Sequence, residues 1–594
     1  MSLLELRSAT FTYPHSENPA LDSVTLDIDA GEYVALIGAN GSGKSSLLRL
    51  FNALLRAGSG VVSIGGLDAA LPSNARDIRT TVSLVFQSPP DQIVATVVEE
   101  DVAFGPENLG LDRAEIERRV TESLEAVGLS EERRRPPHFL SAGQQQRLAV
   151  AGALAMHSRC LAFDEATAML DPPARESILE LMDRLVLAGV TVIHATHDMT
   201  EALRARRLIA LDRGRIVYDG EPAAFFRDAC DEGSARLPCV VAPPALQLSR
   251  MLGVGDSGSG SLQALLERLR DGGSSPVPSP AEGSAARGGV GPVAECAAPY
   301  DEAAFVLDSV SYTYLKGTAH QRGALDTVDL IVGRGSVLAL VGRTGSGKST
   351  LLQLLDALSF PEAGRVLSFG EDTSNPKADL RALRTRAPMA VQRPESALFE
   401  PYAGDDVAFG PRNLGLSGKA LVERVRAAMD RVGLPFDGFR DRATRALSGG
   451  EKRLLALAGV LALEPSALLL DEPTAALDPA TKARILDLVF SLARQGCTVV
   501  MATHSMEEAA RADSVAVIVG GRLAACGPPR SIFYEAYDPA WGIGRPYACE
   551  VVQALREAGV ELEQEPLTVA ELGILFDLEG RSGSPRDGAA EAGA

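Results

Sequence analysis

The sequence predicts an α/β protein built from two copies of one domain. Apolar runs with strand character alternate with runs of helical spacing, which is typical of helices layered on a mostly parallel sheet. Several motifs return after about 305 residues, a constant offset that indicates two large domains rather than small stacked repeats. Both copies also contain the pattern G-x-x-x-x-G-K-[ST] between a strand-like and a helix-like run.

The first of these patterns is the phosphate loop at 38–45, which reads Gly-Ala-Asn-Gly-Ser-Gly-Lys-Ser. It follows the strand-like run 34–37 and precedes the helix-like run 46–55. Its glycines let backbone N–H groups surround a polyphosphate, and the helix N-terminus adds its positive dipole end. Lys44 is expected to reach the terminal phosphates, and the Ser45 hydroxyl to bind Mg²⁺. The residues expected to bind the nucleotide here are Gly38, Asn40, Gly41, Gly43, Lys44, Ser45 and Ser46.

The second phosphate loop, at 342–349, reads Gly-Arg-Thr-Gly-Ser-Gly-Lys-Ser. It lies between the strand-like run 337–341 and the helix-like run 350–358. A second occurrence in the same context makes coincidence an untenable explanation. The corresponding nucleotide-binding residues are Gly342, Thr344, Gly345, Gly347, Lys348, Ser349 and Thr350.

Each copy next contains an apolar run that ends in two acids, Asp164-Glu165 in the first copy and Asp471-Glu472 in the second. A buried strand ending at the carboxyl edge of the sheet places its aspartate where Mg²⁺ bridges the phosphates, and the following glutamate can polarise a water molecule. Alone, such a run is more often a core strand with a solvated acidic end. Its position downstream of a phosphate loop in both copies favours the catalytic interpretation.

Between the phosphate loop and the acidic strand lies Leu447-Ser-Gly-Gly-Glu451, matched in the first copy by Leu140-Ser-Ala-Gly-Gln144. This motif resembles the signature of ATP-binding cassette (ABC) ATPases, and the resemblance covers about 10–240 and 305–545. It implies ATP hydrolysis with Mg²⁺ and a helical subdomain in each copy. By position it also implies glutamines that touch Mg²⁺ and water (Gln87, Gln392), histidines at the γ-phosphate (His197, His504) and tyrosines that stack on adenine (Tyr13, Tyr314). His138, His157 and His194 have no such support and are interpreted as ordinary residues.

In this family two cassettes meet head to tail, so the resemblance implies two composite sites. The signature serine and glycine amides begin a helix and offer donors to the γ-phosphate. Ala142 replaces a signature glycine in the first copy, and we expect its methyl group to hinder close approach and make the two sites unequal. Site one would combine Lys44, Ser45, Gln87, Asp164, Glu165 and His197 with Ser448 and Gly450. Site two would combine Lys348, Ser349, Gln392, Asp471, Glu472 and His504 with Ser141 and Gly143.

Composition divides the chain into five segments. Residues 1–252 form the first predicted cassette and 303–545 the second, joined by a Gly/Ser/Pro-rich linker at 253–302 that contains one short helix at 261–270. Residues 546–579 are a C-terminal extension expected to help hold the pair together, a role that 237–252 fits only loosely for the first copy. The polar end, 580–594, is expected to be disordered.

A narrower resemblance concerns the segments after each glutamine. Residues 85–92 resemble the first ATPase of energy-coupling factor (ECF) transporters, and 392–399 resemble the second. The resemblance implies the fused energy-coupling subunit of an importer for vitamins or metal ions, bound at the cytoplasmic face of the cell membrane. Its partners would be a transmembrane coupling subunit and a membrane substrate-binding subunit. Acidic clusters expected to receive basic helices of the former are Asp91, Glu99, Glu100 and Asp101, and Glu395, Glu400, Asp405 and Asp406.

Charge and hydropathy narrow the alternatives. A net charge of -20 disfavours a nucleic-acid partner, since phosphate backbones are bound mainly through Lys and Arg. No window approaches 18 apolar residues and no signal peptide is recognisable, so the chain is expected to be peripheral to the membrane. The nearest alternative is the tandem ATPase of an ABC importer for sugars or peptides. A soluble tandem cassette acting on ribosomes is disfavoured by the Gly/Ser/Pro-rich linker, and the transported substrate is not encoded in any motif.

Overall fold

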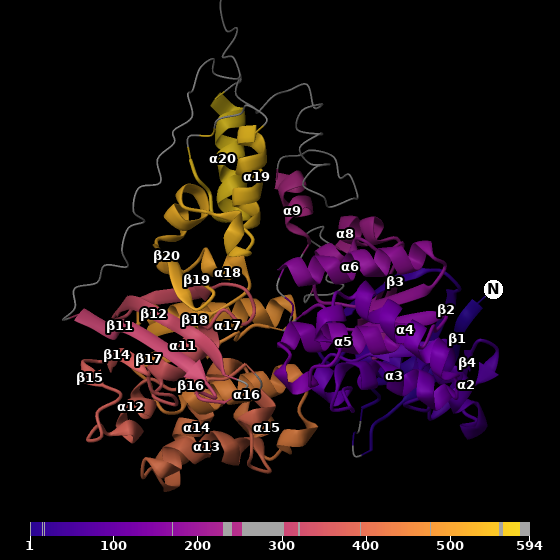
Figure 1. The fold of residues 1–594 in the computed structure, drawn as a ribbon, viewed down its shortest axis with the longest axis horizontal. Helices are drawn as coiled ribbons and strands as arrows, with labels where there is room; N and C mark the ends of the chain where they lie inside the picture. The colour runs from indigo at the N-terminus through magenta and orange to yellow at the C-terminus, as the bar shows by residue number, and fades with distance from the viewer. Residues whose placement is uncertain are drawn as a thin grey trace, which may run out of the picture.

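The computed structural model describes residues 2–14, 16, 18–168, 170, 172–229, 240, 242–251, 302–318, 321–392, 394–475, 477–557, 562 and 564–582. It shows two α/β domains of the same architecture, one from each half of the chain (Figure 1). The predicted fold class is confirmed: each half contains a small antiparallel sheet, a larger mostly parallel sheet and a helical subdomain.

In the first half the antiparallel sheet has the order β2-β1-β4-β5 and the larger sheet the order β10-β9-β3-β8-β7-β6. Strands β9, β3, β8, β7 and β6 run parallel, and β10 closes the edge antiparallel to β9. The strands are β1 (Ser2–Phe11), β2 (Leu21–Asp29), β3 (Tyr33–Gly38), β4 (Ser59–Ile64), β5 (Leu67–Asp68), β6 (Val82–Val85), β7 (Cys160–Asp164), β8 (Thr191–Ala195), β9 (Arg207–Asp212) and β10 (Arg215–Gly220).

Alternation along β3 shows why this sheet is buried on both faces. Val34 and Leu36 point into the core shared with the antiparallel sheet, whereas Ala35 and Ile37 point into the core covered by the helical subdomain. Every residue of β3 is buried, as expected for a central parallel strand. The helices are α1 (Lys44–Phe51), α2 (Ala75–Thr81), α3 (Val98–Leu109), α4 (Arg113–Ala126), α5 (Ala142–Ala155), α6 (Pro172–Leu187), α7 (Met199–Ala202), α8 (Pro222–Ala229) and α9 (Pro244–Met251).

The second half repeats this arrangement with sheet orders β12-β11-β14-β15 and β16-β17-β18-β13-β19-β20. Its strands are β11 (Ala303–Tyr314), β12 (Arg322–Gly333), β13 (Val337–Val341), β14 (Ala363–Ser368), β15 (Glu371–Asp372), β16 (Met389–Ala390), β17 (Ala467–Asp471), β18 (Thr498–Ala502), β19 (Ser514–Val519) and β20 (Arg522–Gly527). Its helices are α11 (Lys348–Leu355), α12 (Leu380–Arg386), α13 (Ala403–Asn413), α14 (Gly418–Val432), α15 (Phe436–Phe439), α16 (Gly449–Leu461), α17 (Pro479–Arg494), α18 (Met506–Ala509), α19 (Tyr547–Glu557) and α20 (Val569–Ser582).

The helix after each phosphate loop begins earlier and ends earlier than its sequence pattern indicates. Gly43 precedes α1 with φ of 108° and Gly347 precedes α11 with φ of 110°, so both glycines adopt a left-handed conformation that starts the helix directly at the lysine. The helices then end at Phe51 and Leu355, although apolar residues continue beyond them. Backbone conformation at the loop, which hydrophobic spacing does not encode, sets the first residue.

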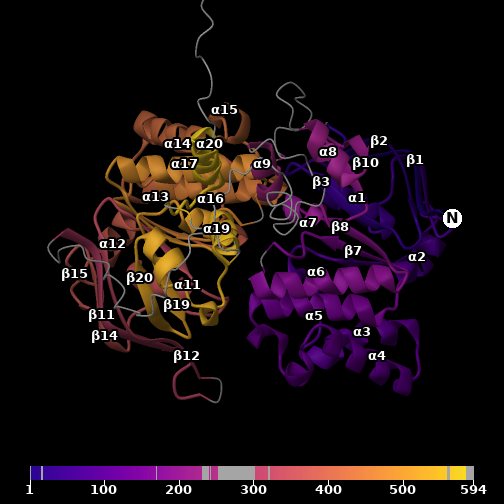
Figure 2. The ribbon, with the colours of Figure 1, turned by 90° about the horizontal axis from the view of Figure 1, so that it is seen from above.

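The two halves lie side by side in both views (Figures 1 and 2), and α9 of the first half lies beside α19 and α20 of the second. Leu248 of α9 is fully buried in a cluster with Val552 of α19 and Leu572 of α20. A Cβ at Gly573 would lie 2.6 Å from the Met251 sulfur, so the glycine lets α9 and α20 approach closely. The extension of the first half therefore contacts the C-terminal extension directly.

Two predicted segments fall partly or wholly outside the described residues. The linker helix at 261–270 lies outside them, as does 583–594 of the expected tail. Residues 580–582 are the last residues of α20, and the expected tail boundary at 580 stays a prediction. Helix propagation is favourable once a helix has formed, and Arg581 continues it in spite of Gly580.

Candidate functional site

Lys44 lies at the mouth of the first phosphate loop, where it is held by the loop's own backbone. Its Nζ donates to the carbonyl oxygens of Gly38 at 2.8 Å and Ala39 at 3.1 Å. The lysine side chain is only 5% exposed. The ammonium group is therefore fixed between the loop and the carboxyl edge of the parallel sheet, where a terminal phosphate of a nucleotide has to be neutralised.

Glu165 is the centre of a cluster that joins three separate segments. Its Oε1 lies 2.5 Å from His197 Nε2 and 3.9 Å from Lys44 Nζ, and its Oε2 accepts a 2.7 Å hydrogen bond from Gln87 Nε2. Burial by itself raises the pKa of Glu165, but the charge of His197, its hydrogen bond and Lys44 outweigh it and hold the pKa below the ordinary value. The carboxylate is thus ionised at neutral pH and able to accept a proton from water.

Ser45 and Asp164 form the second polar pair of this site. Ser45 Oγ donates to Asp164 Oδ1 at 2.9 Å, and burial raises the pKa of Asp164 to about 6, with a further contribution from the charge of Glu165. The oxygen donors of Ser45, Asp164 and Gln87 are of the type that Mg²⁺ prefers. Within the described residues no cluster of three His, Cys, Asp or Glu side chains forms a metal cage. The oxygen donors of Ser45, Asp164 and Gln87 are the observation that fits Mg²⁺ at this site.

The second copy repeats both features. Lys348 Nζ donates to the carbonyl oxygens of Gly342 at 2.7 Å and Arg343 at 3.1 Å. Glu472 Oε1 lies 2.9 Å from His504 Nε2. Burial raises the pKa of Asp471 to about 6 against a hydrogen bond from Ser349, and the bonds of His504 and Gln392 to Glu472 lower the pKa of that buried carboxyl. Both sheets therefore present the same constellation at their carboxyl edges.

Both signature serines cap the helix that follows them. Ser141 Oγ accepts the N–H of Gln144 at 3.2 Å, and Ser448 Oγ accepts that of Glu451 at 3.3 Å, with the reciprocal side-chain bonds completing two capping boxes. The first free amides of α5 and α16 therefore point outward from the helix N-terminus, which suits binding of an anion.

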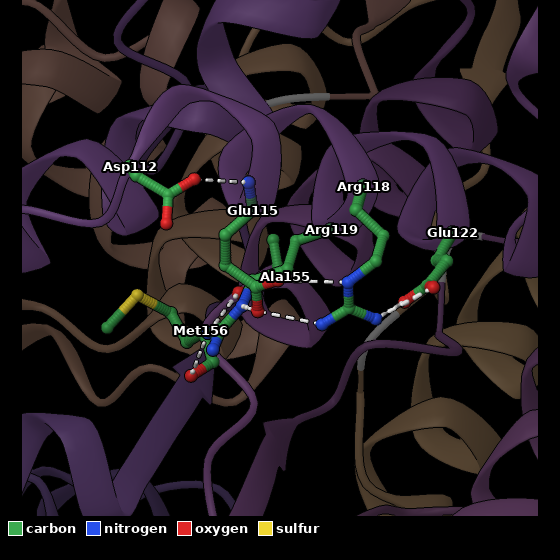
Figure 3. A network of polar contacts seen from close by, with 7 residues as sticks. All are labelled: Asp112, Glu115, Arg118, Arg119, Glu122, Ala155 and Met156. Carbon is green, nitrogen blue, oxygen red and sulfur yellow. Dashed lines mark hydrogen bonds and ion pairs between the residues drawn. The ribbon is translucent and has the colours of Figure 1, made fainter.

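The opposite end of α5 is held by α4 (Figure 3). Arg119 Nη1 donates to the carbonyl oxygens of Ala155 at 3.3 Å and Met156 at 3.4 Å, while its Nε donates to Glu115 at 2.7 Å. The hydrogen bond from Arg118 is the main reason that the pKa of Glu115 falls to about 2. In the second copy Arg424 donates to the carbonyl of Ala462 in the same way. The helical subdomain thus fixes the direction in which each signature helix points.

One signature meets the phosphate loop of the other half. A Cβ built on Gly450 would lie 2.8 Å from Nδ2 of Asn40, and this amide nitrogen is buried without a hydrogen-bond partner in the described structure. A Cβ on Gly143, the counterpart in the first signature, would instead meet Leu170 of its own domain at 3.5 Å. The structure therefore brings together the two halves of site one more closely than those of site two.

The methyl group of Ala142 is not the evident source of this difference. At Gly449, the corresponding position of the second signature, a Cβ would meet no described atom within 4 Å. The side chain of Ala142 itself lies outside the described atoms. The second copy therefore supplies no steric basis for the expected hindrance by a methyl group at this position.

Tyr13 and Tyr314 lie beside the helices that follow the phosphate loops. The Tyr13 hydroxyl is 3.1 Å from Ser46 Oγ, and the Tyr314 hydroxyl is 3.0 Å from Thr350 Oγ1. Both rings are more than one-third exposed. Both rings are therefore partly open to solvent beside the phosphate loop, and their stacking on adenine stays a prediction.

The acidic clusters are only partly exposed: Asp91, Glu100 and Asp405 face solvent, whereas one aspartate of each cluster binds the loop in front of it. Asp101 Oδ1 accepts the backbone N–H groups of Val94 and Ala95 at 2.7 and 2.9 Å, and Asp406 Oδ1 accepts those of Phe399 and Glu400, both at 3.0 Å. These aspartates hold the loop in front of them, because its amides have no strand partner. Glu99 is paired with Arg133 at 2.5 Å, and the side chain of Glu395 lies outside the described atoms.

Exposed apolar side chains, most of them aromatic, lie in the same segments. Phe104 and Val94 are 50% and 61% exposed in the first half. In the second half Phe399 and Tyr402 are 61% and 50% exposed, and Phe399 packs edge-to-face on Phe409 with ring centroids 4.5 Å apart. Exposed clusters of this kind are typical of interaction surfaces.

Two buried glutamates next to the loops of these sites are not among the site residues that the sequence predicted. Glu201 and Glu508 are 4% and 1% exposed. They lie four residues after His197 and His504, the histidines expected at the γ-phosphate and called the switch histidines below. The recurrence of Thr-His-x-Met-x-Glu in both copies was the available signal. His194, interpreted as ordinary, is fully buried 3.5 Å from Glu201, and burial lowers its pKa to about 4.

Comparison with known proteins agrees with this geometry. The family model described as ABC transporter matches twice, at residues 21–168 and 325–475, which together span both phosphate loops and both acidic strands. The chain belongs to the ABC transporter family. The resemblance carried by the signature motifs is thereby confirmed, and the chain is an ABC ATPase that binds and hydrolyses ATP.

Several ABC proteins resemble this chain over different lengths. An ABC transporter ATP-binding protein of Bifidobacterium longum is 38% identical over 522 residues, which cover 85% of this chain and 63% of the relative. One from Methanosarcina mazei is 33% identical over 592 residues, 96% of each chain. The energy-coupling factor transporter ATP-binding protein EcfA1 of Symbiobacterium thermophilum is 51% identical over 234 residues, 39% of this ABC protein and 80% of EcfA1. No helix in the described part of the chain is long and apolar enough to cross a membrane.

Proposed function

We propose that this ABC ATPase is the fused energy-coupling subunit of an ECF-type importer. The likeness to EcfA1, at 51% identity over 234 residues, supports the ECF assignment for one domain's length of the chain. The observation that carries the mechanism is the approach of Gly450 to Asn40, because it joins the second signature to the first phosphate loop within a single chain. A separate ATPase partner is then unnecessary.

Each site would hydrolyse ATP when the two halves close over it. Lys44 and the loop amides hold the phosphates, and Ser448 with the amide of Gly450 covers the γ-phosphate from the other half. Bound Mg²⁺ would neutralise phosphate charge, held by Ser45, Asp164 and Gln87 in the first copy and by Ser349, Asp471 and Gln392 in the second.

Water activation is assigned to the buried glutamates. The oxygen of a water molecule attacks the γ-phosphorus, and the bond from this phosphorus to the leaving ADP oxygen breaks. Glu165 accepts the proton that the attacking water loses. His197, 2.5 Å from that carboxylate, orients Glu165 and contacts the γ-phosphate. Glu472 and His504 have the same roles in site two.

We further propose that site one is the more active of the two, since its halves are in closer contact. The composite arrangement of both sites is tested by replacing the serine of each signature by arginine, which projects a long charged side chain into one site at a time. Ser448→Arg should abolish turnover at the site containing Lys44 and leave nucleotide trapping at Lys348, and Ser141→Arg should do the reverse. Equal trapping at both loops in Ser448→Arg would overturn the composite arrangement.

The transmembrane coupling subunit is proposed to bind the apolar, mainly aromatic surface formed by Val94, Phe104, Phe399, Tyr402 and Phe409, defined here as the coupling surface. Its rim retains acidic groups such as Glu100 and Asp405 that suit a basic helix. Phe399→Ala should therefore weaken assembly with the membrane subunit more than Glu100→Lys. The reverse order would restore the acidic clusters as the main contact.

Identifying the membrane partners decides between importer classes. The full chain is purified from detergent-solubilised membranes, and co-purifying proteins are identified by mass spectrometry. A small membrane substrate-binding subunit is the expected companion of an ECF-type complex. A soluble binding protein would instead indicate an importer for sugars or peptides, and ribosomes would contradict a role in transport.

A further inference from the structure

Glu201 is a buried carboxylate that joins the two loops on which the proposed catalytic groups lie. Its Oε2 accepts hydrogen bonds from Thr167 Oγ1 at 2.9 Å and from Thr196 Oγ1 at 2.6 Å. Thr167 follows Glu165 by two residues, and Thr196 directly precedes His197. One carboxylate oxygen therefore connects the segment of the base to the segment of the histidine.

The second copy contains the same connection with a different geometry. Glu508 Oε1 accepts a hydrogen bond from Thr474 Oγ1 at 2.5 Å, and its Oε2 accepts one from Thr503 Oγ1 at 2.7 Å. Lys482 Nζ lies 2.8 Å from Oε1, in the place that Arg175 occupies near Glu201. The arrangement recurs in two domains whose neighbouring side chains differ.

The hydroxyls of Thr196 and Thr503 each accept a backbone N–H and donate their one proton to the buried glutamate. Thr196 Oγ1 accepts the N–H of Asp198 at 3.0 Å, and Thr503 Oγ1 accepts that of Ser505 at 3.0 Å. Since each hydroxyl has one proton, it is directed to the glutamate. A buried acceptor is required at this point, because an unpaired buried hydroxyl is destabilising.

Backbone hydrogen bonds align these loops for only one residue beyond the paired strands: the Glu165 N–H donates to the Ala195 carbonyl at 3.0 Å, and the Thr196 N–H donates to the Leu36 carbonyl at 3.2 Å. Pairing between β7 and β8 ends at Asp164 and Ala195, and the next residue, Glu165, has a φ of 52° in the left-handed region. The distance of 2.5 Å between Glu165 Oε1 and His197 Nε2 thus depends on contacts outside the ladder. Catalytic geometry tolerates displacements of only about 0.5 Å before the rate falls.

We propose that Glu201 and Glu508 are positioning residues that lock each catalytic glutamate to its switch histidine, an inference that rests on the proposed roles of Glu165, Glu472, His197 and His504. Neither glutamate acts on the nucleotide directly. Each acts through two threonine hydroxyls, so its removal should impair the chemical step while ATP binding by the phosphate loops persists.

The neutral isostere should preserve this function in the first half. Burial raises the pKa of Glu201 to about 7, which shows that its neutral form is accessible in this environment. Because a single oxygen accepts both threonine hydroxyls, the carbonyl oxygen of a glutamine can replace it. Glu201→Gln therefore separates loss of the acceptor from loss of the charge.

The experiment measures steady-state ATP turnover and thermal unfolding of the full chain. The reference protein and each variant carry Glu472→Gln, so that site one alone supplies the turnover, and this reference is called wild type below. Glu201→Ala should lower kcat at least about tenfold with KM within about twofold of wild type, whereas Glu201→Gln should stay within about threefold of the wild-type kcat. Glu176→Ala, an exposed change on α6 outside this hydrogen-bond cluster, serves as the control and should leave both constants unchanged. A wild-type kcat in Glu201→Ala, a rise in KM alone, or equal losses in the Ala and Gln variants would overturn the proposal.

Two further variants keep the test decisive. If Glu201→Ala does not fold, Thr196→Val removes one hydroxyl and Thr196→Ser retains it, so only the valine should lower kcat; equal activity of the two would overturn the proposal. Glu165→Gln separates the two levels of the argument. An active Glu165→Gln variant would overturn the assigned catalytic base together with this inference, whereas an inactive one combined with an active Glu201→Ala would overturn this inference alone.

Discussion

Gly450 offers the sharpest test of the contact between the halves, because a single methyl group can be placed against Asn40. In Gly450→Ala the new Cβ would lie 2.8 Å from Asn40 Nδ2, whereas ordinary contacts of this kind begin at 3.4 Å. The two groups must therefore separate by about 0.6 Å. Because Nδ2 is the end of a side chain that can rotate, we expect a cost at the lower end of the overpacking range, about 1 kcal/mol. If that cost falls on closure, turnover at site one should fall about fivefold.

The neighbouring glycine is the matched control. A Cβ at Gly449 has no described atom within 4 Å, and the first copy already has alanine at this position. Gly449→Ala should therefore keep ATP turnover within about twofold of wild type. Both variants begin the same helix, so any general effect of alanine on α16 is common to them.

Steady-state ATP turnover of the full chain, with closure followed by cross-linking of cysteines placed across the two halves, measures the effect. Adding Asn40→Ala to Gly450→Ala removes the obstructing amide and should recover turnover to the level of Asn40→Ala alone. Equal losses in Gly449→Ala and Gly450→Ala, or no recovery in the double variant, would refute the inference that this contact closes site one.

Three further predictions concern the surroundings of the sites. Burial raises the pKa of Asp356 from 3.8 to about 7, and its Oδ1 has no described hydrogen-bond partner. The corresponding residue of the first half is Asn52, a neutral side chain that donates to the carbonyl of Val82 at 3.0 Å. Because the folded state holds the proton more tightly than the unfolded state, the free energy of unfolding falls as pH rises from about 4 to about 7. Asp356→Asn should therefore stabilise the second domain by about 2–4 kcal/mol at pH 8 and by little near pH 4, as measured by denaturant unfolding. A gain in stability that does not depend on pH would contradict this cause. Leu248→Ala should lower the local stability of the α9, α19 and α20 cluster by about 2–4 kcal/mol and speed amide hydrogen exchange in these helices. Leu187→Ala, at an exposed position, is the control. Unchanged exchange in Leu248→Ala would show that α9 does not stabilise the contact between the two extensions. Asp101→Ala removes the acceptor of the Val94 and Ala95 amides, and the resulting disorder of the loop should weaken binding of the membrane subunit. The disorder should be visible as faster amide hydrogen exchange at 94–97. Loss of binding without faster exchange would indicate that Asp101 contacts the membrane subunit directly.

Local motifs were sufficient to predict the fold class and the identity of both phosphate loops. The pattern around Lys44 and Lys348 specifies a strand, a glycine-rich turn and a helix within about fifteen residues, and short-range backbone geometry enforces that order. The run that ends in Asp164-Glu165 likewise encodes its position, because a buried parallel strand ends at the edge where the nucleotide binds. Each of these features is decided by residues adjacent in the chain.

Charge patterns were a poorer guide to surfaces. Asp101 and Asp406 belong to acidic runs that resemble an exposed docking patch, yet their carboxylates accept loop amides. Whether a carboxylate faces solvent or a backbone N–H depends on the path of the loop in front of it, which is not set by the local sequence. The aromatic coupling surface was hidden for the same reason, since its members come from separate segments.

The sequence alone determined that this protein has two ATP-binding cassettes, which residues form the phosphate loops, and which acids end the strands beside them, because these depend on spacing within one strand, turn or helix. Only the tertiary structure decided that Gly450 meets Asn40 while Gly143 stays within its own domain, that α9 packs on α19 and α20, and that Glu201 ties Thr167 to Thr196. These contacts join residues tens to hundreds of positions apart. They are set by how domains and loops pack, and no local pattern specifies such distances.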